Sequence, residues 1–173
     1  MNLGSPLMKY KFYIGTTRFN NKTWNENVKW REKHKHNGCV YALKKRIVQK
    51  VPKNAIIFVL EMNNDTNKIM GIGIIKNKRD MKQNIKVYHN NDIYYNRFVY
   101  HSNARIDRNK IPYMKMIKVF EELLFTSSRH FKRGLGITIF PWERFPRKKT
   151  RLRIEKFFIL IKNKIDIEKE TKR

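Results

Sequence analysis

Two apolar runs with a short polar segment between them are the clearest pattern in the chain. Residues 55–62 and 68–75 are rich in Ile and Val, whereas residues 63–67 are Asn, Asp and Thr. β-Branched side chains pack well on a pleated surface, and Asn and Asp tolerate turn geometry. The pattern therefore predicts a β-hairpin. Because both runs are almost continuously apolar, we expect other strands of a curved sheet to cover one face and helices to cover the other.

Gly71 and Gly73 alternate within the second of these runs. A glycine inside a strand marks a bend, a bulge or the close approach of another backbone or of a ligand. We favour the interpretation that both glycines belong to a sharply coiled barrel strand.

The chain before the hairpin predicts one strand and two helices. Residues 10–14 form a short aromatic strand pattern. Thr23 and Glu26 have the spacing of a capping box, so a helix should begin there and end near Asn37. Apolar residues at helical spacing predict a second short helix over residues 40–50.

The chain after the hairpin has weaker patterns. Residues 85–88 and 92–100 resemble strands because aromatic and β-branched residues recur in them. Helical spacing predicts a helix at about 113–125. Residues 134–140 form the last predicted strand, and residues from 150 to about 169 form a basic amphipathic helix. These elements predict an α+β fold, a mixed sheet flanked by helices.

Length and composition predict one folded domain. The chain has 173 residues, 40% of them hydrophobic and 13% aromatic, which is enough for a packed core. We expect the domain to cover residues 8–150 and a basic C-terminal helix and tail to cover residues 151–173. Residues 1–7 are interpreted as disordered or vector-derived.

Charge is the strongest functional signal. Forty Lys and Arg oppose 14 Asp and Glu, so the formal net charge is +26. An anionic partner would relieve this self-repulsion, and nucleic acid is the first candidate. An acidic protein or an anionic membrane surface is the alternative, since no apolar run approaches the roughly 18 residues of a membrane span. The single cysteine, Cys39, fits an intracellular, reducing compartment, either cytoplasmic or nuclear. The abundance of Lys, Asn and Ile suggests an AT-rich genome.

The order of the predicted elements adds a family resemblance. Its residues are the aromatic first strand, Trp24, Trp30, Asn37–Leu43, the turn Val51–Asn54 and the glycine-bearing strand Ile69–Ile75. Over about residues 10–76 this pattern resembles the PUA-like barrel group, which includes the EVE, ASCH and YTH domains. The resemblance implies a curved mixed β-barrel that binds RNA or DNA. It also implies a pocket for a modified base beside the hairpin, walled by aromatic side chains.

Two sets of residues are candidates for nucleic-acid contacts. Basic side chains neutralise phosphates, and aromatic faces stack on exposed bases. The candidates for the backbone are Lys44, Lys45, Arg46, Arg129, Lys132, Arg133, Arg144, Arg147, Lys148, Lys149 and Arg151. The resemblance implies base-pocket roles for Trp24, Trp30, Asn37 and Tyr41, and the aromatic patterns add Tyr94, Tyr95, Arg97 and Trp142. For each single aromatic residue, a place in the core is the competing interpretation.

Signs of catalysis are weak. His34, His36 and Cys39 supply three potential zinc ligands where a structural site needs four, so no metal and no cofactor are predicted. The carboxylates are scattered, and no phosphate-binding glycine motif occurs. We therefore expect a non-catalytic protein that binds single-stranded RNA. A DNA-binding accessory protein of viral or plasmid replication or transcription is the first alternative, and a metal-dependent nuclease is the second.

Overall fold

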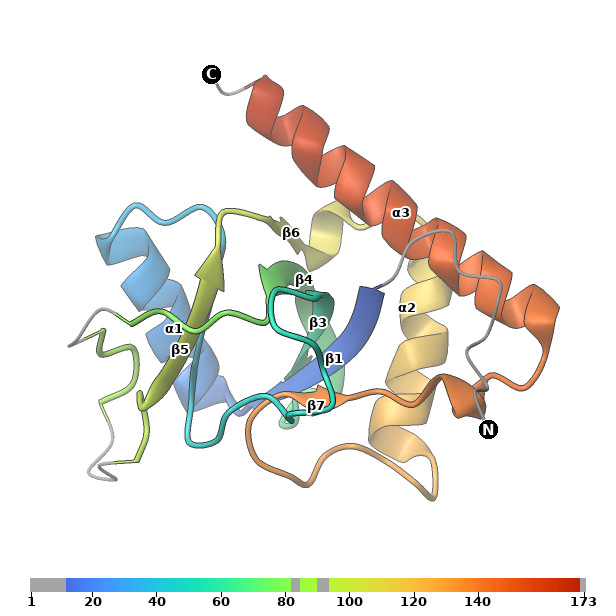
Figure 1. The fold of residues 1–173 in the computed structure, drawn as a ribbon, viewed down its shortest axis with the longest axis horizontal. Coiled ribbons are helices and arrows are strands. Elements are labelled where there is room, and N and C mark those ends of the chain that lie inside the picture. Colours follow the sequence, from blue (N-terminus) through green and yellow to red (C-terminus); the bar gives the residue numbers. More distant parts are fainter. Residues whose placement is uncertain (1–11, 82–84, 90–93, 172–173) are drawn as a thin grey trace.

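A mixed five-stranded sheet, in the order β6-β4-β3-β1-β7, forms the centre of the computed structural model, which describes residues 12–81, 85–89 and 94–171 (Figure 1). Its strands are β1 (Phe12–Phe19), β3 (Ile56–Asn63), β4 (Lys68–Lys76), β6 (Arg105–Asp107) and β7 (Thr138–Ile139). Strands β1 and β3 are parallel, and all other pairs are antiparallel. The predicted hairpin is confirmed, because β3 and β4 are neighbours joined by residues 64–67.

A second sheet pairs β2 (Cys39–Leu43) with β5 (Phe98–Ser102). Strand β2 replaces the helix expected over residues 40–50. All five of its residues are buried, and a short continuous apolar run has no periodicity that separates a strand from a buried helix. The strands of the described chain therefore form two sheets and not a closed barrel.

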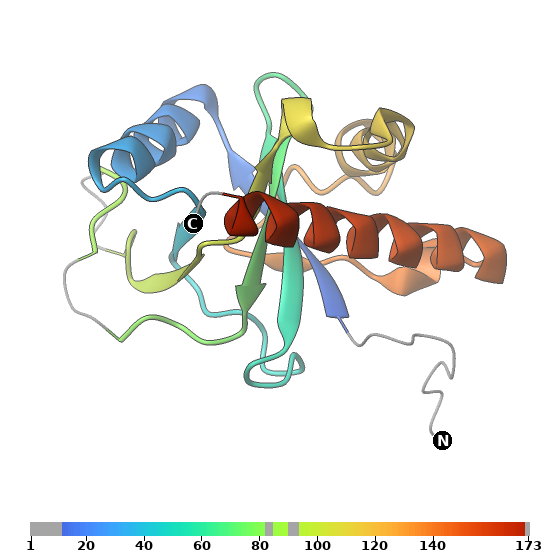
Figure 2. The same cartoon turned by 90° about the horizontal axis from the view of Figure 1, so that it is seen from above.

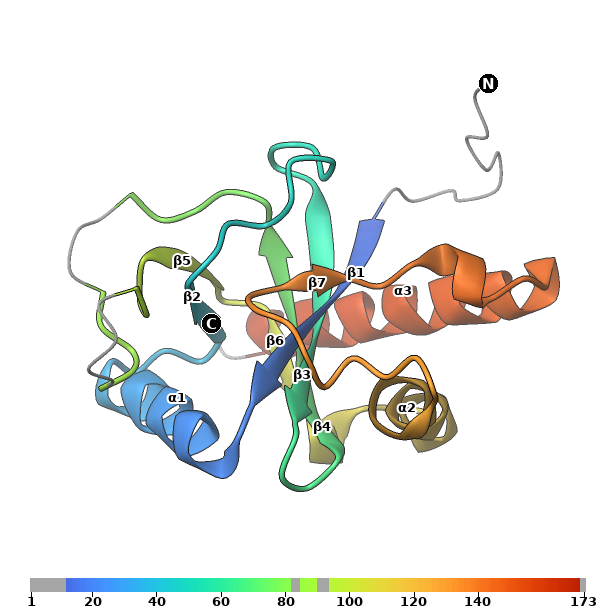
Figure 3. The ribbon, with the colours of Figure 1, turned by 90° about the horizontal axis from the view of Figure 1, so that it is seen from below.

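Two of the three described helices cover one face of the large sheet and the second sheet covers the other, as the continuously apolar hairpin predicted (Figure 2). The helices are α1 (Asn21–Lys33), α2 (Met114–Glu121), which continues as the π-helical turn η2 (Glu122–Thr126), and α3 (Lys148–Glu170), with short 3-10 turns η1 (Arg108–Lys110) and η3 (Trp142–Arg144). Phe120 of α2 and Phe158 of α3 pack against Phe58 and Leu60 of β3. On the other face, Val59 contacts the β2–β5 sheet. Helix α1 lies beside that second sheet (Figure 3).

Several boundaries differ from the sequence patterns. The capping box of α1 joins Asn20 and Thr23, three residues before the predicted one, because Asn20 Oδ1 accepts from the Thr23 N–H at 2.8 Å. Residues 85–88 are not a strand: the N–H groups of Val87 and Tyr88 donate to the Asn96 side chain and not to another strand. Of the run at 92–100, residues 92–93 lie outside the described chain, and the strand begins at Phe98.

The strand predicted at 134–140 is reduced to Thr138–Ile139, because Gly134 and Gly136 have positive φ angles of 126° and 72° and cannot extend the strand. The C-terminal helix is confirmed and begins two residues earlier than predicted. Within the described residues, no helix combines the length and the apolar character that crossing a membrane requires.

Candidate nucleic-acid interface

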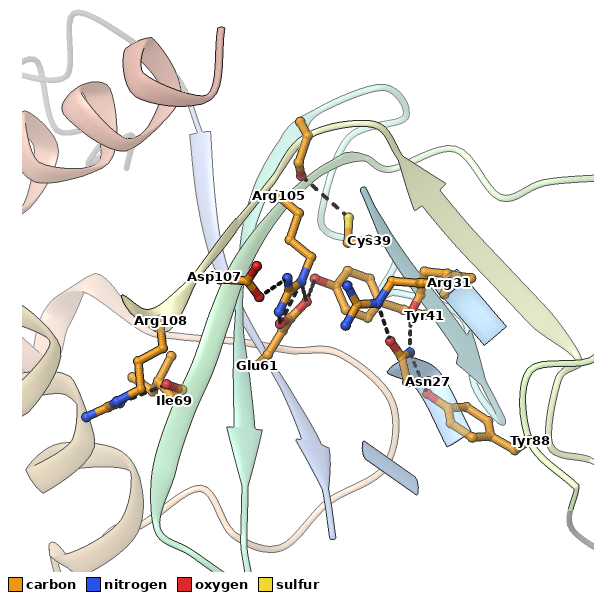
Figure 4. A network of polar contacts seen from close by, with 12 residues as sticks. Asn27, Arg31, Cys39, Tyr41, Glu61, Ile69, Tyr88, Arg105, Asp107 and Arg108 are labelled. Atoms are coloured by element: carbon orange, nitrogen blue, oxygen red, sulfur yellow. Dashed lines mark hydrogen bonds and ion pairs between the residues drawn. The ribbon is translucent and has the colours of Figure 1, made fainter. Parts of the chain in front are cut away.

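A buried polar network joins the two sheets (Figure 4). The Tyr41 hydroxyl donates to Glu61 Oε1 at 2.8 Å, and Arg105 Nη2 donates to Glu61 Oε2 at 2.8 Å. Arg105 Nη1 donates to Asp107 Oδ1 at 2.5 Å. The side chains of Arg105 and Glu61 are 3% and 2% exposed, so water screens this ion pair very little. We call Tyr41, Glu61, Arg105 and Asp107 the sheet joint.

The pKa shifts follow from this packing. Burial raises the pKa of Tyr41 well above its ordinary value, and the neighbouring Cys39 and Glu61 add to the shift. Burial alone would lower the pKa of Arg105, but the charge and the hydrogen bonds of Glu61 outweigh burial and raise it. Arg105 therefore keeps its positive charge in this buried position.

Gly71 and Gly73 make room for the sheet joint. A Cβ at Gly73 would lie 2.1 Å from the Tyr41 hydroxyl, and a Cβ at Gly71 would lie 2.6 Å from Arg105 Nη2. The two glycines therefore permit the close approach of side chains from β2 and β6, in place of the coiled barrel strand that we favoured. Tyr41 is 1% exposed and is not available to a base, which corrects its predicted place in the pocket.

A separate pocket opens where β1 and β2 end. Its volume is about 260 Å³. We call it the strand-end pocket; it is lined by Thr17, Arg18, Phe19, Asn20, Thr23, Ala42, Leu43, Lys44, Asn64, Tyr88, Tyr95, Lys132 and residues 134–136. Ligand pockets for drug-sized molecules span roughly 300–1,000 Å³, so this one suits a single group smaller than such a molecule.

Asn64, which lines the strand-end pocket, has one unpaired buried acceptor. Its Nδ2 donates to the carbonyl oxygen of Lys132 at 2.9 Å, which orients the amide. Its Oδ1 is buried and has no hydrogen-bond partner within the described structure. An unpaired buried acceptor costs about 1–3 kcal/mol, and an N–H donor that reached it through a small movement of the Asn64 side chain would remove this cost.

An aromatic side chain with a cation above it forms one wall of this pocket. Lys44 Nζ lies 4.2 Å from the centre of the Tyr95 ring. Tyr88 packs edge-on against Tyr95, with 6.0 Å between ring centres, and the amide of Asn27 donates to its hydroxyl. Tyr95 therefore has an aromatic neighbour at its edge and a cation over one face, so a base would stack on this ring by displacing Lys44 or by using the opposite face.

Arg18 holds the loop that closes the pocket. Its Nε donates to the Phe131 carbonyl at 2.7 Å, Nη1 donates to the Gly136 carbonyl at 3.0 Å, and Nη2 donates to the Thr138 hydroxyl. Burial lowers the pKa of this guanidinium. Sequence reasoning missed Arg18, although a lone cation near the end of an otherwise buried strand is a visible signal.

The structure brings two of the predicted basic segments together at the pocket. Lys44 and Lys132 line it, and a Cβ at Gly136 would lie 3.4 Å from the Lys45 carbonyl oxygen. Arg129 and Arg133 are exposed on the same loop as Lys132. Segments that are far apart in sequence thus form one basic rim.

The other predicted residues lie elsewhere. Arg147, Lys148 and Lys149 lie at the start of α3, across the molecule from α1 (Figure 1). Arg144 and Arg151 hydrogen bond to the carbonyls of Arg129 and Phe145. These two arginines therefore stabilise the backbone near them through hydrogen bonds and also carry positive charge.

The remaining aromatic candidates are also dispersed. Trp142 packs against Phe12 in the core, and Trp30 stacks on His34. Tyr94 is 55% exposed beside Arg97, and Arg46 lies over Phe98. Trp24 and Asn37 line a different cavity, between α1 and β6. The structure therefore brings Tyr95 alone, of the predicted aromatic residues, into the strand-end pocket.

Metal ligands do not cluster in the part of the chain that the structure describes: no three His, Cys, Asp or Glu side chains there could hold an ion together. Comparison of the chain with protein families, curated proteins and solved structures finds no match.

Proposed function

We propose that the protein binds single-stranded nucleic acid, RNA in preference to DNA, and holds one base in the strand-end pocket. The observation that carries the proposal is a cavity that Tyr95 walls, that Lys44 and Lys132 rim, and that Asn64 lines with an unpaired Oδ1 just beneath its surface. A base offers a flat face to the tyrosine and an N–H edge to the amide. The phosphates on either side would contact the basic rim.

The proposal includes kinship with the PUA-like group. The supporting features are the hairpin of β3 and β4, its parallel neighbour β1, and a pocket that takes Asn64 from the hairpin turn. In several members of that group a modified base lies in a pocket beside the corresponding hairpin. The proposal requires no catalytic step.

Fluorescence anisotropy with labelled single-stranded RNA, single-stranded DNA and duplex DNA tests the proposal. We expect the RNA to bind most tightly and the affinity to fall steeply with salt. Equal affinity for duplex DNA would favour the DNA-binding alternative. Cleavage of the RNA in Mg²⁺ or Mn²⁺ would favour the nuclease.

Matched variants separate stacking from charge. Tyr95→Ala should weaken RNA binding by about 1–3 kcal/mol, the value of one stacked base, and change the preference among bases. Tyr94→Ala, which removes an exposed neighbouring ring outside the pocket lining, is the control and should change little. Equal losses in the two variants would exclude the pocket as the base site.

The rim has a test of its own. Each phosphate contact on a single strand contributes roughly 0.7 to the slope of log affinity against log salt. Replacing both Lys44 and Lys132 with Met should therefore lower the slope by about 1.4 for every sequence alike. Replacing Lys115 and Lys118, which are exposed on α2, should leave the slope nearly unchanged.

A further inference from the structure

A second cavity, of about 980 Å³, lies between α1, β6 and the start of α2. We call it the α1–β6 cavity; its lining includes Trp24, Arg31, Glu32, Lys35, Arg105 and Asp107. It is distinct from the strand-end pocket, since no described residue lines both. Nothing in the proposed base site uses it.

Arg31 is the unusual side chain in this cavity. Its Nε donates to Asn27 Oδ1 at 3.0 Å, and the Asn27 amide in turn donates to the Val40 carbonyl at 2.8 Å. These bonds fix the guanidinium. Its two terminal nitrogens make no hydrogen bond or ion pair with any described residue, so four N–H donors remain for water or a ligand.

The neighbouring arginines differ from Arg31 because each has a carboxylate partner. Arg105 pairs with Glu61 and Asp107, and Arg108 pairs with Glu121. Burial lowers the pKa of Arg31, and the positive charge of Arg105 lowers it further, although Glu61 and Asp107 oppose this. A guanidinium in this position gains from an added anion.

The rest of the lining leaves a small excess of positive charge. Of its carboxylates, Asp107 pairs with Arg105, and Glu168 lies 3.6 Å from Lys110. Glu32 is the remaining carboxylate, exposed on α1, and it opposes the two cations Arg31 and Lys35. An anionic ligand would therefore pair with Arg31 and Lys35 without breaking an existing buried ion pair.

We propose that the α1–β6 cavity binds a phosphate monoester through the fork of Arg31, with Lys35 as a second cation. A planar guanidinium presents parallel N–H donors that match two phosphate oxygens, and a dianion gains more from this pair than a carboxylate does. Arg31 Cζ and Arg105 Cζ lie 5.7 Å and 5.6 Å from the centre of the Trp24 ring, so a group held by the fork lies next to an indole that two guanidiniums already contact. A nucleotide is the ligand that offers both a phosphate and a flat ring, and its source is either a free nucleotide or the terminal phosphate of a strand.

Titration calorimetry of the full chain at low salt, with adenosine 5′-monophosphate, adenosine and inorganic phosphate, tests this proposal. The monophosphate should bind about 10-fold more tightly than adenosine, since one charge-assisted bond is worth roughly 1.5 kcal/mol or more. Inorganic phosphate should compete with it. Equal binding of adenosine and its monophosphate, or no binding of either, would overturn the proposal.

Variants at three positions test where the phosphate binds. Arg31→Met should weaken binding of the monophosphate about 10-fold. Lys33→Met removes an exposed cation from the same helix and should have no effect. Because Arg31 also bonds to Asn27, Lys35→Met is the second variant; it has no side-chain bond in the described structure and should weaken binding without unfolding the protein. Equal loss in the Lys33 and Lys35 variants would show diffuse attraction and exclude a site.

Two further measurements distinguish a free nucleotide from the terminal phosphate of a strand, and the phosphate site from the base pocket. A strand with a 5′-phosphate that binds more tightly than its 5′-hydroxyl counterpart identifies a terminal phosphate, whereas no difference identifies a free nucleotide; both results keep the site. Asn64→Leu should leave binding of the monophosphate intact. Failure of the base pocket therefore appears in the Asn64 and Tyr95 variants, and failure of the phosphate site appears in the Arg31 and Lys35 variants.

Discussion

The sheet joint and the strand-end pocket are both made of polar side chains, yet they differ in one respect. In the joint, Arg105, Glu61 and Tyr41 satisfy one another out of contact with water. In the pocket, Asn64 keeps a buried acceptor without a partner. A buried network that is completely paired holds the fold together, whereas an incomplete one leaves free energy available to a ligand. The sheet joint therefore differs from the candidate binding site in whether its polar atoms are paired, not in how polar they are.

The largest expected effect comes from breaking the joint. Glu61→Leu leaves Arg105 charged and buried without its main partner, so we expect a loss of about 3–5 kcal/mol in the free energy of unfolding, measured by urea denaturation. The double variant Glu61→Leu with Arg105→Met removes both charges and should recover most of the loss. An unchanged urea midpoint in Glu61→Leu would mean that the pair contributes nothing to stability.

An intermediate effect is expected at Arg18, which connects the core to the pocket. Arg18→Lys keeps the charge but cannot make the three bonds to residues 131, 136 and 138. We expect about 1–3 kcal/mol lower stability and faster proteolysis of the loop at 131–137, together with weaker RNA binding. The exposed Arg129 on the same loop provides the control: Arg129→Lys should leave the rate of proteolysis as it is. Equal rates of proteolysis in the two variants would show that Arg18 does not stabilise this loop.

The smallest effect concerns Asp107 at the exposed edge of the joint. Partial burial alone would raise the pKa of Asp107, but the hydrogen bond and charge of Arg105 outweigh it and hold the pKa below its ordinary value of 3.8. A lowered folded-state pKa means that this carboxylate stabilises the protein above pH 3.8 and that the contribution is lost as the pH falls below that value.

Urea midpoints at pH 5 and at about pH 3 for the parent chain and for Asp107→Asn measure this contribution. The parent should be the more stable at pH 5, and the difference should shrink at the lower pH. The difference will be small because the Asp107 side chain is 59% exposed. A constant difference at both pH values would contradict the assigned pKa shift.

Part of the fold could be predicted because its signals are local. The hairpin and α3 follow from apolar spacing within one segment, and the cover on both faces of the hairpin follows from its continuous apolar runs. Strand β2 could not be separated from a helix, because its five buried residues show no period. Gly73 makes room for a side chain from another sheet. The sequence indicated a close approach at this glycine, but it could not identify the group that approaches.

The sequence by itself determined the excess of cations, the central hairpin and the amphipathic C-terminal helix, since composition and local period are properties of single segments. Only the tertiary structure decided that Tyr41 is buried while Tyr95 lines a pocket, and that Asn64 keeps a free acceptor. The physical reason is distance along the chain. Glu61 and Arg105 are 44 residues apart, and Asn64 and Lys132 are 68 apart, so their pairing exists only once the sheets have come together.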